Sequence, residues 1–148
     1  MEARALAIGT ARARIAIGVA GVVAPGAAAR MMGGKSAADG LTPLFVRMVG
    51  ARDIALGLGT VVALDRGAPV RGWLEGSALA DAADGVASLL GRDRLKPWAL
   101  RTTVAVATGS AVFGPLLAKR LDPPPPPDPG HLEAVATGHS SETVPAAS

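Results

Sequence analysis

Four apolar segments of 21 to 25 residues fill most of the first 120 positions, at about 5–29, 41–64, 70–90 and 98–118. A helix needs about 20 mostly apolar residues to cross the hydrocarbon core of a membrane. The gaps between the segments are short and contain glycine, proline or charged residues, which is typical of connections between antiparallel helices. The sequence therefore predicts an all-α fold, a four-helix transmembrane bundle formed by residues 1–120.

The composition favours lipid over water as the surroundings of these helices. Only 18% of the 148 residues are charged, against about 25% in soluble domains. A soluble Ala-rich bundle, the alternative, needs a polar face on every helix, yet no charged residue occurs between Thr102 and Ala118. Trp73 and Trp98 lie near segment ends, where an interfacial belt places aromatic residues. We expect a multi-pass protein of the cell membrane.

The C-terminal residues 121–148 differ in character from the rest. They contain five consecutive prolines, Pro123 to Pro127, followed by a small, polar and aperiodic stretch. Proline runs favour an extended polyproline II form, and such a stretch buries too little apolar surface to offset its ordering entropy. The sequence predicts a disordered Pro-rich tail.

The distribution of basic residues gives a weak indication of topology. With four spans, the two termini and the second loop share one side, which carries seven basic residues against six on the other. This excess favours both termini in the cytoplasm. Arg4, Arg12 and Arg14 before an apolar run imitate a signal peptide, but the basic region is long, so we expect an uncleaved first helix.

Several classes of function lack the residues that they need. The chain has no cysteine, and both histidines, His131 and His139, lie in the tail. This argues against thiolate chemistry, a haem protein, a zinc enzyme and a Ser-His-Asp hydrolase. The pair Gly57 and Gly59 has no phosphate-loop context, and the basic residues lack the interleaved aromatic residues of a nucleic-acid reader. We predict no catalytic residue, no metal and no cofactor, and a protein that is not an enzyme.

The charged residues inside the second and third segments are the candidate site. A charge at the centre of a bilayer costs about 2.5–3.5 kcal/mol on insertion scales, so such residues face the interior of the bundle, pair with each other or lie near the interface. The candidates, as an intramembrane charge cluster of ligand-binding or structural character, are Arg47, Arg52, Asp53, Asp81 and Asp84.

Helical spacing and depth suggest how these residues meet. On each of the two segments, four residues at helical spacing fall on one face of the helix. These stripes are Gly50, Asp53, Gly57 and Thr60 on the second segment, and Ser77, Asp81, Asp84 and Ser88 on the third. Counted from the turn near Gly67, Arg52 lies at a depth similar to that of Asp81 and Asp84. We expect Arg52 to pair with one of these two aspartates, and Arg47 to reach toward the other membrane face.

Two interpretations of this cluster remain open. Ion pairs between helices can simply hold them in register. Alternatively, the charges form a polar pocket that binds an anionic lipid headgroup or a small polar ligand, or passes protons. The expected partners are the lipid bilayer and either a second copy of the chain or another membrane protein, and not nucleic acid.

The stretch from Val46 to Leu58, with Ala80-Asp81-Ala82 on the next helix, resembles an uncharacterised actinobacterial four-helix membrane family, a domain of unknown function. The likeness covers residues 10–118. More loosely, Arg14-Ile-Ala-Ile-Gly18 and the Gly-Leu pattern are similar to DoxX-like membrane proteins, which implies association with quinone or thiol redox systems. Those proteins usually carry an acid before that pattern, where this chain has Arg52-Asp53, and the chain has no cysteine for such chemistry.

Three functions follow as hypotheses. The first is a non-catalytic membrane component that binds lipids or partners. The second is a small transporter or permease-like helper whose charges line a cavity. The third, implied by the DoxX-like resemblance alone, is a membrane redox accessory protein.

Overall fold

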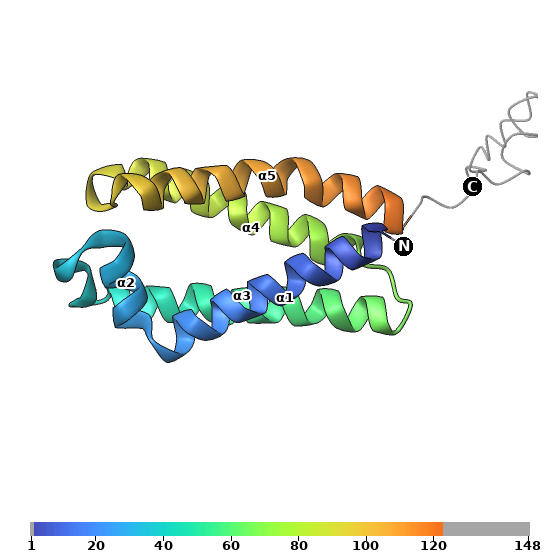
Figure 1. Ribbon diagram of the computed structural model, residues 1–148, viewed down its shortest axis with the longest axis horizontal. Helices are drawn as coiled ribbons and strands as arrows, with labels where there is room; N and C mark the ends of the chain where they lie inside the picture. The colour runs from blue at the N-terminus through green and yellow to red at the C-terminus, as the bar shows by residue number, and fades with distance from the viewer. Residues whose placement is uncertain (1, 123–148) are drawn as a thin grey trace, which may run out of the picture.

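The computed structural model describes residues 2–122, and all of its regular structure over that range is helical (Figure 1). The prediction of an all-α fold is therefore confirmed for this part of the chain. Disorder from residue 121 onward is wrong for the first two residues of the predicted tail, because Leu121 ends the last described helix and Asp122 caps it, and the rest of that tail lies outside the described residues. Four long helices run lengthwise, and a short helix and two 3-10 turns lie at one end. The elements are α1 (Glu2–Val23), α2 (Pro25–Gly33), η1 (Lys35–Ala38), α3 (Thr42–Asp65), α4 (Arg71–Leu90), η2 (Arg92–Arg94) and α5 (Pro97–Leu121).

The first apolar segment is two helices, so the single helix expected at 5–29 is wrong. Helix α1 ends at Val23, and α2 begins at Pro25 after Ala24, whose backbone angles are φ −126° and ψ 55°. Proline has no N–H to donate to the preceding turn, and its ring clashes with that turn's carbonyl. The chain therefore breaks at Ala24, and α2 starts with proline in its first turn, where proline is tolerated.

The long helices form two close pairs, α1 with α3 and α4 with α5 (Figure 1). In the first pair the backbones touch through glycines. A Cβ added to Gly50 would lie 2.6 Å from the carbonyl oxygen of Gly18, and one added to Gly57 would lie 2.7 Å from that of Ala11. No side chain fits at these two crossings, which explains why glycine occupies them.

The second pair is fastened at the end where α5 stops. The Asp122 carboxylate accepts hydrogen bonds from the backbone N–H groups of Val70 and Arg71, the latter at 2.6 Å. The Arg71 guanidinium in turn donates to the Asp122 carbonyl oxygen at 2.9 Å. Free N–H groups at a helix start are commonly satisfied by a nearby carboxylate. Here that carboxylate comes from the far end of the neighbouring helix.

The residues that face the interior are mostly small, and they recur at intervals of three, four or seven positions. This spacing is that of the seam of a left-handed coiled coil. The seam residues are Ala7, Ala11, Gly18 and Gly21 on α1, Gly50, Gly57, Thr60 and Leu64 on α3, and Leu74, Ala78, Asp81 and Gly85 on α4.

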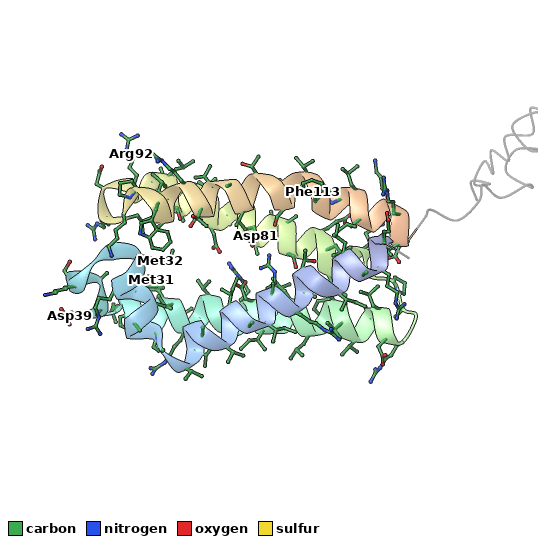
Figure 2. All side chains as sticks on the ribbon, viewed as in Figure 1. Met31, Met32, Asp39, Asp81, Arg92 and Phe113 are labelled. Atoms are coloured by element: carbon green, nitrogen blue, oxygen red, sulfur yellow. The ribbon has the colours of Figure 1, made fainter. Side chains whose placement is uncertain are left out.

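Large apolar side chains lie mostly on the outside. Within residues 2–122, Val70 is the one large apolar side chain that is fully buried. Leu58 is 48% exposed, Leu79 72% and Phe113 60%, whereas Asp81 lies between the two helix pairs (Figure 2). The interior of the described residues is thus formed mostly by small residues and a few polar ones, while large apolar side chains lie exposed, which departs from the usual order of a protein in water.

The glycine crossings give a first prediction. Gly50→Ala should lower the free energy of unfolding by about 1–3 kcal/mol, because the new methyl group meets a backbone carbonyl that cannot move aside. Gly9→Ala is the matched control, since an added Cβ there meets nothing within 4 Å. It should stabilise α1 by about 0.5–1 kcal/mol through reduced backbone entropy. Thermal unfolding of the purified chain in detergent measures both, and equal effects would contradict the close approach.

Candidate functional site

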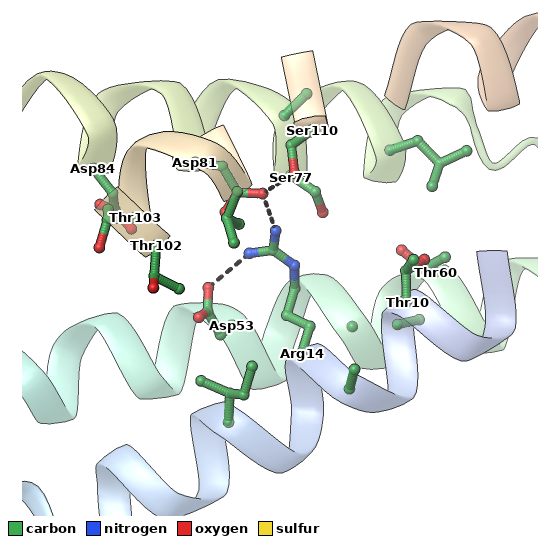
Figure 3. Close-up of a pocket in the computed structure, with 17 residues that line it drawn as sticks. Thr10, Arg14, Asp53, Thr60, Ser77, Asp81, Asp84, Thr102, Thr103 and Ser110 are labelled. Carbon is green, nitrogen blue, oxygen red and sulfur yellow. Dashed lines mark hydrogen bonds and ion pairs between the residues drawn. The ribbon is translucent and has the colours of Figure 1, made fainter. Parts of the chain in front are cut away.

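The Arg14 side chain of α1 joins three helices (Figure 3). Its Nη1 donates to Asp53 Oδ1 of α3 at 2.8 Å, and its Nη2 donates to Asp81 Oδ2 of α4. The Ser110 hydroxyl of α5 donates to the same Asp81 oxygen. The side chains of Arg14, Asp53 and Asp81 are only 15%, 13% and 8% exposed. A buried guanidinium thus links the two helix pairs, and each long helix contributes one polar group.

These four groups form a layer at half the length of the molecule. Arg14, Asp53, Asp81 and Ser110 each lie within two residues of the midpoint of their helix. Arg14 and Asp53 also occupy the empty positions in the two stripes of small residues, between Ala11 and Gly18 and between Gly50 and Gly57. The two backbone crossings of α1 and α3 therefore flank this ion pair on both sides and fix the separation of its helices.

A second ion pair extends the layer. Arg52 binds Asp84 through two hydrogen bonds, Nη1 to Oδ1 at 3.0 Å and Nη2 to Oδ2 at 2.6 Å. Its Nη2 also donates to Asp53 Oδ1 at 3.2 Å. Asp53 Oδ1 thus accepts from both arginines and joins the two pairs into one network, which we call the charge layer: Arg14, Arg52, Asp53, Asp81, Asp84 and Ser110.

The structure brings together four of the five candidates from the sequence. Of the two partners expected for Arg52, the structure selects Asp84, while Asp81 belongs to Arg14. Arg47 lies outside the charge layer, because its exposed side chain turns to the Val22 carbonyl oxygen at 3.4 Å. The stripe predicted on α3 is present, with Gly50, Gly57 and Thr60 buried. The stripe predicted on α4 is not its buried face, because Asp81 is the one member that is buried, together with Leu74, Ala78 and Gly85.

Sequence reasoning missed Arg14 and Ser110 as members of the site. In the sequence, Arg14 stands out as part of the N-terminal basic region and of the stretch Arg14-Ile-Ala-Ile-Gly18 that is similar to DoxX-like proteins. The available signal was its spacing, since it falls three residues after Ala11 and four before Gly18 in a stripe of small residues. Ser110 carries no charge, and nothing in its local sequence distinguishes it from the serines and threonines around it.

A cavity of about 430 Å³ adjoins the charge layer. All four long helices line it, and Figure 3 shows Arg14 reaching between them with Asp53 below and Asp81 above. Its lining combines carboxylates, one guanidinium, hydroxyls and aliphatic groups. The lining residues are Thr10, Ala11, Ala13, Arg14, Ile17, Asp53, Gly57, Thr60, Leu74, Ser77, Ala78, Asp81, Asp84, Thr102, Thr103, Val106 and Ser110.

The chemistry of this lining suits binding and proton exchange. Among the described residues, no group of three or more His, Cys, Asp and Glu side chains is placed to hold a metal ion. The carboxylates face guanidinium groups instead of one another, so each has a cation beside it.

Comparisons with protein-family models, with curated proteins and with solved structures found no match to this chain.

Removal of Arg14 should be the most damaging single change in the charge layer. Arg14→Ala leaves Asp53 and Asp81 buried without their shared cation, and breaking a buried pair in this way costs about 3–5 kcal/mol. Arg12→Ala is the matched control, because Arg12 is exposed two residues away on α1 and should change stability by about 0.5 kcal/mol or less. Arg52→Ala should fall between them, since that side chain is 31% exposed. Chemical unfolding in mixed micelles measures the three, and a harmless Arg14→Ala would refute the bridging role.

Proposed function

We propose that this chain is a multi-pass membrane protein. The supporting observation is that large apolar side chains lie exposed at mid-length, as at Leu79 and Phe113, while Arg14, Asp53 and Asp81 at the same level are largely buried. Arg12, exposed at mid-length of α1, is an exception whose long side chain would extend toward an interface. Soluble monomers rarely expose apolar patches on this scale. Within residues 2–122, α1 and α5 are long and apolar enough to cross a membrane. Helices α3 and α4 carry Arg52, Asp53, Asp81 and Asp84 of the charge layer, which lower the mean hydropathy of these two helices.

The ends of the helices also suit this proposal. Trp73 lies in the first turn of α4 and Trp98 in the first turn of α5. Because these two helices are antiparallel, the two half-exposed rings lie toward opposite ends of the pair, where a membrane would have its two interfaces. The start of α1 packs against the end of α5, through Ala7 with Leu117 and Ala118. If all four long helices span, both ends of the domain lie on the same side. The count of basic residues favours the cytoplasmic side.

A substitution on the outer face tests the membrane assignment. Leu79→Arg places a charge at mid-length of α4 and should cost about 2.5–3.5 kcal/mol if lipid surrounds that position. Leu90→Arg is the control, because Leu90 is similarly exposed but ends the helix, where arginine reaches the interface. We expect wild type and Leu90→Arg to stay in the membrane through alkaline carbonate washing, with Leu79→Arg depleted there. A chain that is soluble without detergent, or a harmless Leu79→Arg, would refute the assignment.

Within the membrane, we infer that the protein binds a small polar ligand in the cavity beside the charge layer, without catalysing a reaction. A cavity of about 430 Å³ falls within the range of small-molecule sites, which combine apolar walls with a few placed polar groups. Ionisable residues at membrane depth commonly mark such sites. A small transporter is the second candidate, because the cavity lies at mid-length between two helix pairs, each of which is packed more closely within itself than against the other pair. No cysteine or aromatic residue lines the cavity to favour a redox role.

Native mass spectrometry of the full chain, purified from its own membranes, tests ligand binding. We expect wild type to retain a small molecule of defined mass and Asp81→Asn to lose it while staying folded. Asp93→Asn, a change of the same kind at a side chain that is 93% exposed on η2, should retain it. Wild-type protein that carries no specific mass, in preparations where the fold is intact, would contradict the proposed function.

A further inference from the structure

We propose that the cavity selects a small organic cation, a protonated amine with an aliphatic body. This inference rests on the proposed ligand-binding function and specifies its chemical class. It comes from the charge balance of the charge layer, from oxygen atoms there that lack donors, and from the lining of the cavity.

The charge layer holds one negative charge too many. Three carboxylates, those of Asp53, Asp81 and Asp84, face two guanidinium groups. Apart from these, no charged residue within positions 2–122 lines the cavity. An uncompensated charge in surroundings of low dielectric constant is strongly unfavourable. A bound monocation makes the site neutral, whereas an anionic lipid headgroup would deepen the imbalance, which argues against that ligand for this cavity.

Two carboxylate oxygens are left without donors. Among the described residues, no hydrogen bond reaches Asp81 Oδ1 or Asp53 Oδ2, although both side chains line the cavity. Neither oxygen is fully buried, since among the described residues the one fully buried side-chain nitrogen or oxygen without a hydrogen-bond partner is Arg52 Nε. Both oxygens therefore keep accessible surface and are free to accept hydrogen bonds from a ligand. An ammonium group brings N–H donors that fit this deficit, and such charge-assisted hydrogen bonds are among the stronger ones.

Hydroxyl groups surround the same space. Ser77, Thr102 and Thr103 line the cavity and make no side-chain hydrogen bond within residues 2–122. Thr10 and Thr60 donate to carbonyl oxygens of their own helices, which leaves their hydroxyl oxygens free to accept. An ammonium nitrogen with two or three hydrogens could therefore donate to a carboxylate and to hydroxyl oxygens together.

The remaining lining narrows the class of cation. The volume of about 430 Å³ exceeds what a bare alkali ion fills and matches a small organic molecule. Ile17, Leu74 and Val106 supply aliphatic walls for its body. No aromatic residue lines the cavity, and quaternary ammonium groups, which have no N–H, are typically held by aromatic rings. A primary or secondary amine therefore fits better than a quaternary one.

Calorimetric titration of the full chain in nonionic detergent tests this selectivity with four small probes. These are n-butylammonium, tetramethylammonium, 1-butanol and butyrate, each titrated in a sodium chloride background. We expect n-butylammonium to bind at least about tenfold more tightly than any of the others, which corresponds to the strength of one charge-assisted hydrogen bond. A second series replaces sodium by potassium, and the affinity for n-butylammonium should not change.

Asp81→Asn supplies the matched variant. It leaves two carboxylates for two guanidinium groups, and Arg14 keeps Asp53 as its partner, so the charge layer becomes neutral without an ammonium ion. Its affinity for n-butylammonium should fall about tenfold or more, whereas Asp93→Asn should bind as wild type does. The probe series on wild type decides the proposal even where Asp81→Asn folds poorly.

The contrary outcomes separate the two proposals. Equal binding of 1-butanol and n-butylammonium, or tighter binding of butyrate, would overturn the amine and leave a polar-ligand cavity in place. Competition by sodium or potassium at similar concentration would assign the site to inorganic cations and overturn the organic one. Absence of binding by all four probes, together with native protein that carries no ligand, would overturn the ligand-binding function itself.

Discussion

The bridge that Arg14 makes between Asp53 and Asp81 is the interaction on which the arrangement of the helices depends. Each helix pair is held internally by contacts of small residues, whereas the two pairs meet through ion pairs and a few packing contacts. The glycine crossings beside Arg14 make the bridge possible, because they bring α1 close enough to α3 for a guanidinium to bind Asp53 and still reach α4. The glycines therefore set the distance between α1 and α3, and at that distance Arg14 binds both Asp53 and Asp81.

This arrangement follows from the proposed surroundings. In lipid, apolar side chains gain little by leaving the solvent, so helix association relies on close packing and on polar contacts. Coulombic attraction between the same groups grows as the dielectric constant falls. A chain with small and charged residues inside and large apolar residues outside matches these two conditions. The same low dielectric constant makes a third carboxylate beside two guanidinium groups costly, and this imbalance is the basis on which we propose a cationic ligand.

The sequence predicted the helices and part of the site, for reasons that particular residues make clear. Apolar length located three of the four long helices, and the period of 3.6 residues placed Asp53 with Gly50 and Gly57 on one stripe of α3. Depth counted from Gly67 showed that Arg52 could reach Asp81 or Asp84. It could not show that α1 carries a competing arginine at the same level, because that requires knowing which helices are neighbours. Pro25 was a readable break, but the small apolar residues on both sides of it continue the apolar segment and concealed the end of α1.

The turn between α3 and α4 has a mechanical consequence. It connects the two helix pairs through a few residues that include Gly67, whose φ of 64° is left-handed, and Asp122 fastens α5 to α4 at that same end. At the opposite end the pairs meet through Lys96, whose backbone N–H donates to the Met32 carbonyl oxygen at 2.9 Å. The two helix pairs are thus connected by the turn with Gly67 at one end and by the Lys96–Met32 hydrogen bond at the other. The charge layer lies midway between these two ends. A small rotation of one helix pair about the turn would therefore change the distances between its carboxylates and guanidinium groups.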